Sequence, residues 1–481
     1  MLNKPHLVAA FLLLTSFGFG QIGAEIFVPW SHPYETGSLT NTTFEPLILD
    51  THEIVVPGAS SIRLLLTDAQ LGPKDAILVR SLWDAQTQRL TAAELVQWQN
   101  SSAYFNGDTL YLSLLVQPGS TASYEIATVL VEAGPIPSGD SICGPTDDRV
   151  LSQDWRSMRA LGSSFCTVWA AGPECLLSAG HCSGTLSVAQ AEVPLSTATG
   201  SLVQPPVDRQ WPILAGGVTN NGGVGNDYAV RLVGTNSQGV RPADLYGYFT
   251  LATTVPAAGA AIRVTGYGST TSAFASLTWY GVNKTHAGPF VGLNGFQLQY
   301  TPDTTGGNSG SPVILDSTGE AIGIHTHGGC TSTGGSNSGT FLGRPEVQAA
   351  IAATCPDPNA LRVVLTGQPS FGLNIAIENI PANSVEGYTI FSLNTALPVG
   401  QGVFLGLMPD TLTIAGFGLP AQSGSLFHFV VPSLPTHYPS VPFNFPAGTF
   451  AAFAGISVDA VALLIQNPFT FEVSDVVRHT F

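Results

Sequence analysis

Residues 307–312 read Gly-Asn-Ser-Gly-Ser-Pro and have the composition of a reactive turn. Glycine permits a tight turn and a close approach of the backbone to another molecule, because it has no Cβ. The amides of Gly307 and Ser309 could therefore converge on one point and stabilise a developing oxyanion. Since an apolar stretch at 313–315 follows the turn, Ser309 is a candidate nucleophile.

A serine hydroxyl is a weak nucleophile at neutral pH and needs a general base within hydrogen-bond reach. Of the ten histidines, His181 has the most suitable context, because small residues follow an apolar run before it and Cys182 follows directly. A carboxylate at the start of a strand could then orient this imidazole and stabilise its charged form. Residues 226–232 place Asp227 at such a position. Each residue alone is more often structural, but the three together favour a catalytic interpretation.

Residues 178–182 read Ser-Ala-Gly-His-Cys and residues 227–229 read Asp-Tyr-Ala. Together with residues 307–312, these motifs resemble those of the trypsin/chymotrypsin superfamily of serine proteases, and within it the bacterial glutamyl-endopeptidase (V8-like) branch. The order histidine, aspartate, serine differs from the triad order of subtilisin-like enzymes and α/β-hydrolases. The separations of 46 and 82 residues agree with two six-stranded barrels. The resemblance therefore implies an all-β protein with a trypsin-like double β-barrel protease domain.

The resemblance also assigns roles to particular residues. His181, Asp227 and Ser309 are expected to form the catalytic triad, with the amides of Gly307 and Ser309 as the oxyanion hole and with no metal or organic cofactor. Cys166 and Cys182 match a disulfide that is widespread in trypsin-like enzymes. The other four cysteines stay unassigned, because six cysteines permit fifteen pairings; they are Cys143, Cys175, Cys330 and Cys355.

The residue preference before the scissile bond has two interpretations. In glutamyl endopeptidases a histidine and a Thr or Ser bind the substrate carboxylate, and His325 and Thr304 occupy the matching positions. Asp303 supports the alternative, because trypsin-like enzymes place at its position the carboxylate that attracts Arg or Lys. We favour cleavage after Glu or Asp. The other residues expected at the pocket wall are Thr326 and His327.

The residue before the candidate nucleophile is Asn308. Trypsin-type zymogens have an aspartate there, which forms a buried ion pair with a newly cut N-terminus. A neutral amide cannot form that pair with the same strength. We therefore expect the candidate active site to be ordered by something other than an ion pair with a newly cut N-terminus.

Composition and pattern divide the chain into a leader and three regions. The leader, residues 1–24, is typical of a secretory signal peptide, with Lys4 before a short apolar run and small residues at its end. Flanking regions of alternating apolar and polar residues predict two small β-sandwiches. The expected divisions are an N-terminal accessory or pro-domain at 25–133, a linker at 134–142, the protease domain at 143–355 and a C-terminal accessory domain at 360–481.

The overall composition agrees with a secreted all-β protein. Only 10% of residues are charged, whereas Gly and Pro number 53 and 34, which is typical of short strands joined by tight turns. The formal charge of −16 opposes binding to nucleic acid or anionic lipid. No later apolar segment is a convincing membrane span, and an oxidising compartment suits the six cysteines.

The expected function is a secreted, extracellular serine endopeptidase that acts on polypeptide substrates. Two alternatives stay open. One is a catalytically silent protease fold that binds a cell surface or carbohydrate, for which the aromatic C-terminal region offers a candidate face. The other is an esterase that uses the same triad. Whether residues 25–142 are removed on activation is also open.

Overall fold

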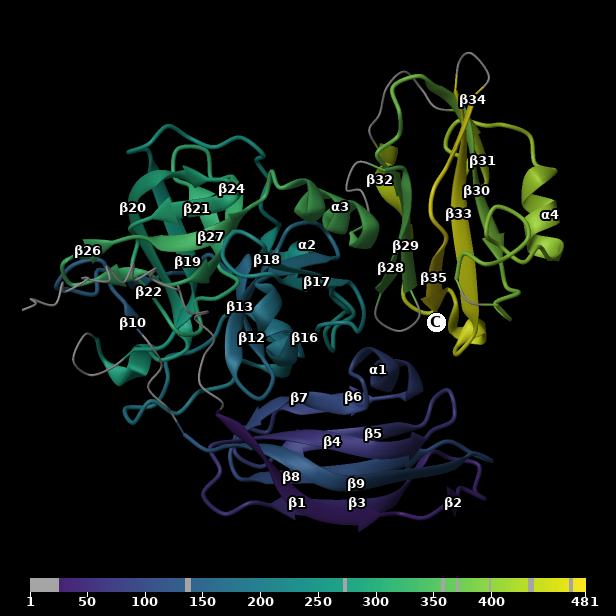
Figure 1. Ribbon diagram of the computed structural model, residues 1–481. Helices are drawn as coiled ribbons and strands as arrows, with labels where there is room; N and C mark the ends of the chain where they lie inside the picture. Colours follow the sequence, from purple (N-terminus) through teal and green to yellow (C-terminus); the bar gives the residue numbers. More distant parts are fainter. Residues whose placement is uncertain are drawn as a thin grey trace, which may run out of the picture. The chain divides into compact units, whose positions relative to one another are not determined.

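The computed structural model describes residues 26–134, 140–270, 275–355, 360–368, 372–397, 399–430, 437–466 and 470–481. It divides into two compact units, one ending at Pro356 and the other beginning at Asp357 (Figure 1). The predicted signal peptide and most of the predicted linker lie outside the described residues. In the described ranges, no helix is both long and apolar enough to cross a membrane.

The first unit begins with a β-sandwich, drawn in purple and blue in Figure 1. One antiparallel sheet has the order β1-β9-β4-β7, with β2 beside β9, and the other has the order β3-β8-β5-β6. A single short helix, α1 (Ala92–Gln97), begins with a capping box formed by Thr91 and Glu94. The strands are β1 (Phe27–Glu35), β2 (Leu39–Thr40), β3 (Leu47–Val55), β4 (Ser61–Gln70), β5 (Ala76–Ser81), β6 (Thr87–Leu90), β7 (Ser101–Asn106), β8 (Thr109–Val116) and β9 (Thr121–Glu132).

The sandwich shares its apolar core with the region that follows it. Phe165 and Tyr280, which lie beyond residue 140, are buried in the same cluster as the sandwich residues Phe27 and Tyr104. The Tyr104 hydroxyl donates to the carbonyl of Gly162 at 2.9 Å. Such continuous burial explains why the sandwich and the next region form one compact unit.

The next region contains two seven-stranded antiparallel sheets with the orders β16-β15-β12-β13-β14-β18-β17 and β11-β20-β19-β23-β24-β27-β21. An extra pairing between β20 and β21 closes the second sheet on itself. The strands of the first sheet are β12 (Ser157–Leu161), β13 (Phe165–Ala170), β14 (Cys175–Ser178), β15 (Val188–Gln190), β16 (Gln210–Pro212), β17 (Val218–Asn221) and β18 (Asp227–Leu232). Those of the second are β11 (Val150–Leu151), β19 (Ala261–Gly268), β20 (Val282–Asn294), β21 (Gln297–Tyr300), β23 (Pro312–Leu315), β24 (Ala321–His327) and β27 (Asn337–Phe341). The all-β, double-barrel prediction is confirmed.

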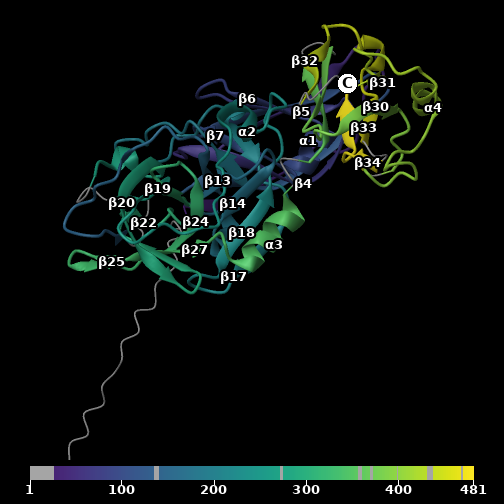
Figure 2. The same cartoon turned by 90° about the horizontal axis from the view of Figure 1, so that it is seen from above.

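Shorter elements and three disulfides complete this region. Helix α3 (Pro345–Thr354) packs against β18 of the first sheet (Figure 2). The remaining elements are β10 (Asp140–Ser141), η1 (Gly180–Thr185), η2 (Val207–Arg209), α2 (Pro242–Tyr246), η3 (Leu277–Trp279), β22 (Thr304–Thr305), β25 (Cys330–Thr331) and β26 (Gly334–Gly335). The disulfides are Cys166–Cys182, the pair that the resemblance implies, and Cys143–Cys330 and Cys175–Cys355, which the sequence left open.

The second unit is another β-sandwich. Its sheets have the orders β28-β29-β32 and β31-β30-β33-β34, with β35 also beside β33. Phe443, Phe445 and Phe450 pack against its apolar core, so these aromatic side chains contribute to folding. The elements are β28 (Arg362–Gln368), β29 (Gly372–Glu378), β30 (Ser384–Ser392), α4 (Thr411–Phe417), β31 (His428–Val430), β32 (His437–Phe445), η4 (Ala451–Phe453), β33 (Ser457–Gln466), β34 (Thr470–Val473) and β35 (Val477–Thr480).

Candidate active site

Three side chains predicted from separate motifs meet where the two seven-stranded sheets adjoin. His181 lies on η1, which follows β14 of the first sheet, and Asp227 begins β18 of the same sheet. Ser309 lies between β22 and β23, and β23 belongs to the second sheet. His181 Nε2 is 2.7 Å from Ser309 Oγ, and His181 Nδ1 is 2.5 Å from Asp227 Oδ2. Asp227 and Ser309 are fully buried. The arrangement has the geometry of a nucleophile, a base and an orienting carboxylate.

Several contacts hold the histidine and the aspartate in place. Asp227 Oδ1 accepts a hydrogen bond from the backbone amide of His181 at 3.0 Å. A Cβ on Gly180 would lie 2.0 Å from the carbonyl oxygen of Asn220, so only glycine lets this segment approach β17. Thr340 Oγ1 accepts from the Asp227 amide at 3.1 Å and donates to the Asp227 carbonyl at 2.8 Å. Thr340 therefore fixes the backbone of Asp227, and no sequence motif identifies it.

Along the turn that carries Ser309, backbone amides that donate to a carbonyl alternate with amides for which the described part of the chain provides no acceptor. Gly307 has φ of +98°, and a Cβ there would lie 2.2 Å from the Phe165 ring, so glycine is required. The Asn308 amide donates to the carbonyl of Thr305 at 2.9 Å, and the Gly310 amide donates to another carbonyl at 2.8 Å. Within the described part of the chain, the Gly307 and Ser309 amides have no such acceptor. Two neighbouring unpaired N–H groups can stabilise an oxyanion.

The wall predicted to contact the substrate side chain contains a neutral histidine. His325 is fully buried, and its Nδ1 is 2.7 Å from the Tyr300 hydroxyl. Burial, together with the smaller effects of the nearby His327 and His181, lowers the pKa of the His325 imidazole to about 3. Burial also raises the pKa of Tyr300 well above its ordinary value, so the phenol stays protonated. His325 is therefore a neutral hydrogen-bonding group at physiological pH.

Thr304 lies on β22 and Thr326 on β24, and both were predicted to line the substrate pocket. The Thr304 hydroxyl is buried and has no hydrogen-bond partner among the residues that the structure describes. An unpaired buried hydroxyl is costly unless a ligand satisfies it. The carbonyl oxygen of Thr326 is 3.3 Å from Ser309 Oγ.

His327 lies beside the candidate triad. Its Nδ1 is 2.8 Å from the Thr326 hydroxyl and 3.9 Å from Asp227 Oδ2. Burial lowers the pKa of His327, although the charge of Asp227 opposes this shift. His327 therefore lies next to Asp227, the carboxylate that orients His181 in the candidate triad.

Asp303 has a different environment from a substrate-facing carboxylate. Its oxygens accept the amides of Cys143 at 2.7 Å and Asp148 at 2.8 Å, and its side chain is fully buried. His286 Nδ1 lies 3.2 Å from Asp303 Oδ2 and accepts the Asp303 amide at 2.8 Å. Asp148, His286 and Asp303 are close enough to share a cation, but each of the three side chains already accepts a hydrogen bond within the protein.

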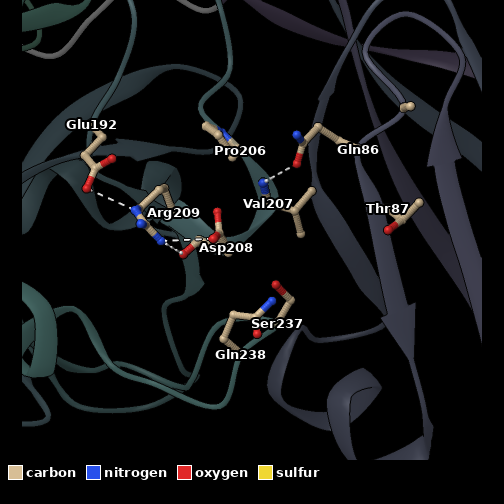
Figure 3. Close-up of a pocket in the computed structure, with 10 residues that line it drawn as sticks. Gln86, Thr87, Glu192, Pro206, Val207, Asp208, Arg209, Ser237 and Gln238 are labelled. Atoms are coloured by element: carbon tan, nitrogen blue, oxygen red, sulfur yellow. Dashed lines mark hydrogen bonds and ion pairs between the residues drawn. The ribbon is translucent and has the colours of Figure 1, made fainter.

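A separate polar pocket of about 470 Å³ lies between the N-terminal sandwich and the first sheet (Figure 3). Arg209, its cationic group, is already paired with Glu192 and Asp208, each at 3.0 Å. None of the predicted site residues lines this pocket. The lining residues are Ala85, Gln86, Thr87, Glu192, Pro206, Val207, Asp208, Arg209, Ser237 and Gln238.

Comparison with known proteins agrees with this geometry. Residues 142–341 match the model of the trypsin family. The chain therefore carries a trypsin-like serine protease domain. A curated relative, the glutamyl endopeptidase of Bacillus licheniformis, is 29% identical over 208 residues, which cover 38% of this chain and 60% of the relative.

Two solved structures are also similar to part of the chain. One is a Glu endopeptidase in complex with MPD, with a TM-score of 0.35 and 20% identity over 44% of this chain and 98% of the other. The second is a thermostable serine protease from an extremophilic microorganism, with a TM-score of 0.33 and 16% identity over 43% of this chain and 100% of the other.

Proposed function

We propose that this protein is a secreted serine endopeptidase whose nucleophile is Ser309. The observation that carries the proposal is the continuous pair of contacts from Ser309 Oγ to His181 Nε2 and from His181 Nδ1 to Asp227. The trypsin-family match over residues 142–341 supports it. The three disulfides are consistent with an oxidising compartment.

The proposed reaction proceeds through an acyl-enzyme. Ser309 Oγ attacks the scissile carbonyl carbon while His181 Nε2 accepts the hydroxyl proton. The amides of Gly307 and Ser309 stabilise the tetrahedral oxyanion, and losing one such donor costs about 10²–10³-fold in rate. His181 then protonates the leaving amine as the peptide bond breaks. Water, deprotonated by His181, hydrolyses the ester, and Asp227 holds the imidazole orientation throughout.

We further propose that the pocket accepts Glu or Asp. The unpaired Thr304 hydroxyl can donate a hydrogen bond to a substrate carboxylate, and neutral His325 matches the second position of the glutamyl-endopeptidase pattern. The competing preference for Arg or Lys depends on Asp303. Because both Asp303 oxygens already accept backbone amides, this alternative has less support.

The two β-sandwiches are proposed to be accessory domains. The amides of Ile26 and Phe27 donate to the carbonyl of Ser163 at 2.9 Å, and the Leu202 amide donates to Glu132 at 2.8 Å. Removing the N-terminal sandwich would expose the apolar cluster that it shares with Phe165. We therefore favour a retained domain over a discarded pro-region.

Digestion of a peptide library tests this function. We expect cuts after Glu or Asp, and no cuts by the Ser309→Ala variant. Enrichment of Arg or Lys before the cut would contradict the pocket assignment alone. Turnover of esters without turnover of peptides would favour an esterase, and no turnover of either would favour a silent binding protein.

A further inference from the structure

A buried guanidinium contacts the loop that carries the proposed nucleophile. Arg149 precedes β11 and is 4% exposed. Its Nη1 donates to Thr305 Oγ1 at 2.7 Å and to Asn308 Oδ1 at 3.2 Å, and its Nη2 donates to the Ser269 carbonyl at 3.1 Å. A cation of the chain itself therefore meets the side chain of the residue immediately before Ser309.

Asn308 is held on more than one side. Its Oδ1 also accepts the Thr305 amide at 3.0 Å, and its Nδ2 lies 3.4 Å from Ser311 Oγ. A Cβ on Gly268 would lie 2.2 Å from Asn308 Oδ1 and 2.5 Å from Arg149 Nη1, so the cluster is closely packed. Holding the Asn308 side chain in place also restrains the turn that contains Gly307 and Ser309.

The charge of Arg149 is compensated away from this turn. Asp147 accepts from Arg149 Nε at 2.8 Å and from Nη2 at 2.6 Å, and both side chains are 2% exposed. Burial would raise the pKa of Asp147, but the hydrogen bonds and charge of Arg149 hold it below its ordinary value. Since Asp147 already supplies the counter-charge, an aspartate at position 308 would add a second buried anion. A neutral amide fits this environment.

We propose that Arg149 is a positioning residue that locks the oxyanion turn through Asn308 and Thr305, so that the site assembles in the uncut chain. The cation belongs to a side chain, and no newly formed N-terminus is needed to supply it. This inference rests on the proposed protease function and extends it to how the enzyme becomes active. It also agrees with a retained N-terminal sandwich.

The test measures fluorophosphonate labelling and peptide hydrolysis by the intact chain, whose length is verified by mass spectrometry. We expect the uncut protein to react at its full rate. Arg149→Ala should lower kcat about 10²-fold with a smaller change in KM, because a small misplacement of reacting groups has that cost. Millimolar guanidinium should restore at least part of the lost rate, whereas urea should not.

Arg156→Ala is the matched control. Arg156 binds Asp154, two residues earlier, with the same bidentate pattern as Arg149 and Asp147, but its side chain is 29% exposed. We expect this variant to keep wild-type activity and to show no response to guanidinium.

Other results would overturn the inference. One such result is a wild-type protein that reacts only after cleavage near the sandwich boundary. Another is an Arg149→Ala variant that reacts at the wild-type rate. A third is a loss in Arg149→Ala that guanidinium does not restore even in part. If Arg149→Ala does not fold, Arg149→Lys decides, with a measurable reduction in kcat supporting the proposal and an unchanged kcat opposing it. A wild-type protein inert both before and after cleavage would instead contradict the proposed protease function.

Discussion

Replacing Asp227 with asparagine changes the proton on His181 while keeping the shape of the site. The backbone amide of His181 donates to Asp227 Oδ1 at 3.0 Å, so an asparagine must place its carbonyl oxygen there. Its NH₂ group would then face His181 Nδ1, which is 2.5 Å from the present Oδ2. Nδ1 must accept this hydrogen bond, and the ring proton moves to Nε2. The nitrogen facing Ser309 then becomes a donor and can no longer accept the hydroxyl proton.

The expected cost follows from this change of tautomer. An aspartate-to-asparagine change in a serine protease triad lowers kcat about 10⁴-fold, or about 5.4 kcal/mol of transition-state stabilisation. The assay is hydrolysis of a peptide substrate at neutral pH, with the melting temperature as a check of folding. Asp316→Asn is the control, because Asp316 is an exposed partner of Arg263. A folded Asp227→Asn variant within tenfold of wild-type kcat would refute the reasoning.

Three further substitutions test other parts of the site. Thr304→Val should lower kcat/KM for a Glu peptide about 10- to 100-fold, because one hydrogen bond to a charged group is lost. The kcat/KM for the matching Gln peptide should stay nearly unchanged. Equal losses for both peptides would oppose a carboxylate-binding role. Gly307→Ala should lower the fluorophosphonate labelling rate at least about 10²-fold, since the new Cβ would meet the Phe165 ring and the oxyanion turn would shift. An unchanged labelling rate would contradict the need for glycine at this position. His325 has a pKa lowered to about 3, so the unfolded chain binds the extra proton between about pH 6.5 and 3, and stability falls as the pH falls through that window. His325→Gln should reduce this slope by up to about 1.4 kcal/mol per pH unit in denaturant titrations, and an unchanged slope would show that His325 is not the group responsible.

The sequence predicted the parts of the site that short local motifs encode. The turn around Ser309, the small residues before His181 and the strand start at Asp227 each have their own pattern, and their order links them. The double-barrel fold followed from the same resemblance and is confirmed. The roles of these residues stay predictions until they are tested in solution.

Contacts between segments that are far apart in the chain could not be predicted from short sequence motifs. The direction of the Asp303 carboxylate depends on amides of residues 143 and 148, which lie more than 150 positions earlier in the chain. Thr340 and Arg149 also contact the site from distant segments of the chain, and neither belongs to a recognisable motif. Side-chain direction depends on packing against such partners, and residue type alone does not fix it.

The shared core of the first unit is a similar case. Composition indicated a change of region near residue 134 but gave no sign of how the two regions pack. The feature that shows this packing is the burial pattern of β7. Five consecutive residues of this strand are buried, whereas a strand with one face in solvent would alternate buried and exposed residues. Its short run of small and aromatic residues is too ambiguous to read without the neighbouring sheet.

Peptide mass spectrometry of the protein labelled with a fluorophosphonate probe identifies the nucleophile itself. We expect one adduct per chain, on Ser309, in the wild-type protein and none in His181→Ala. An adduct on another residue, or no adduct on a folded wild-type protein, would contradict it.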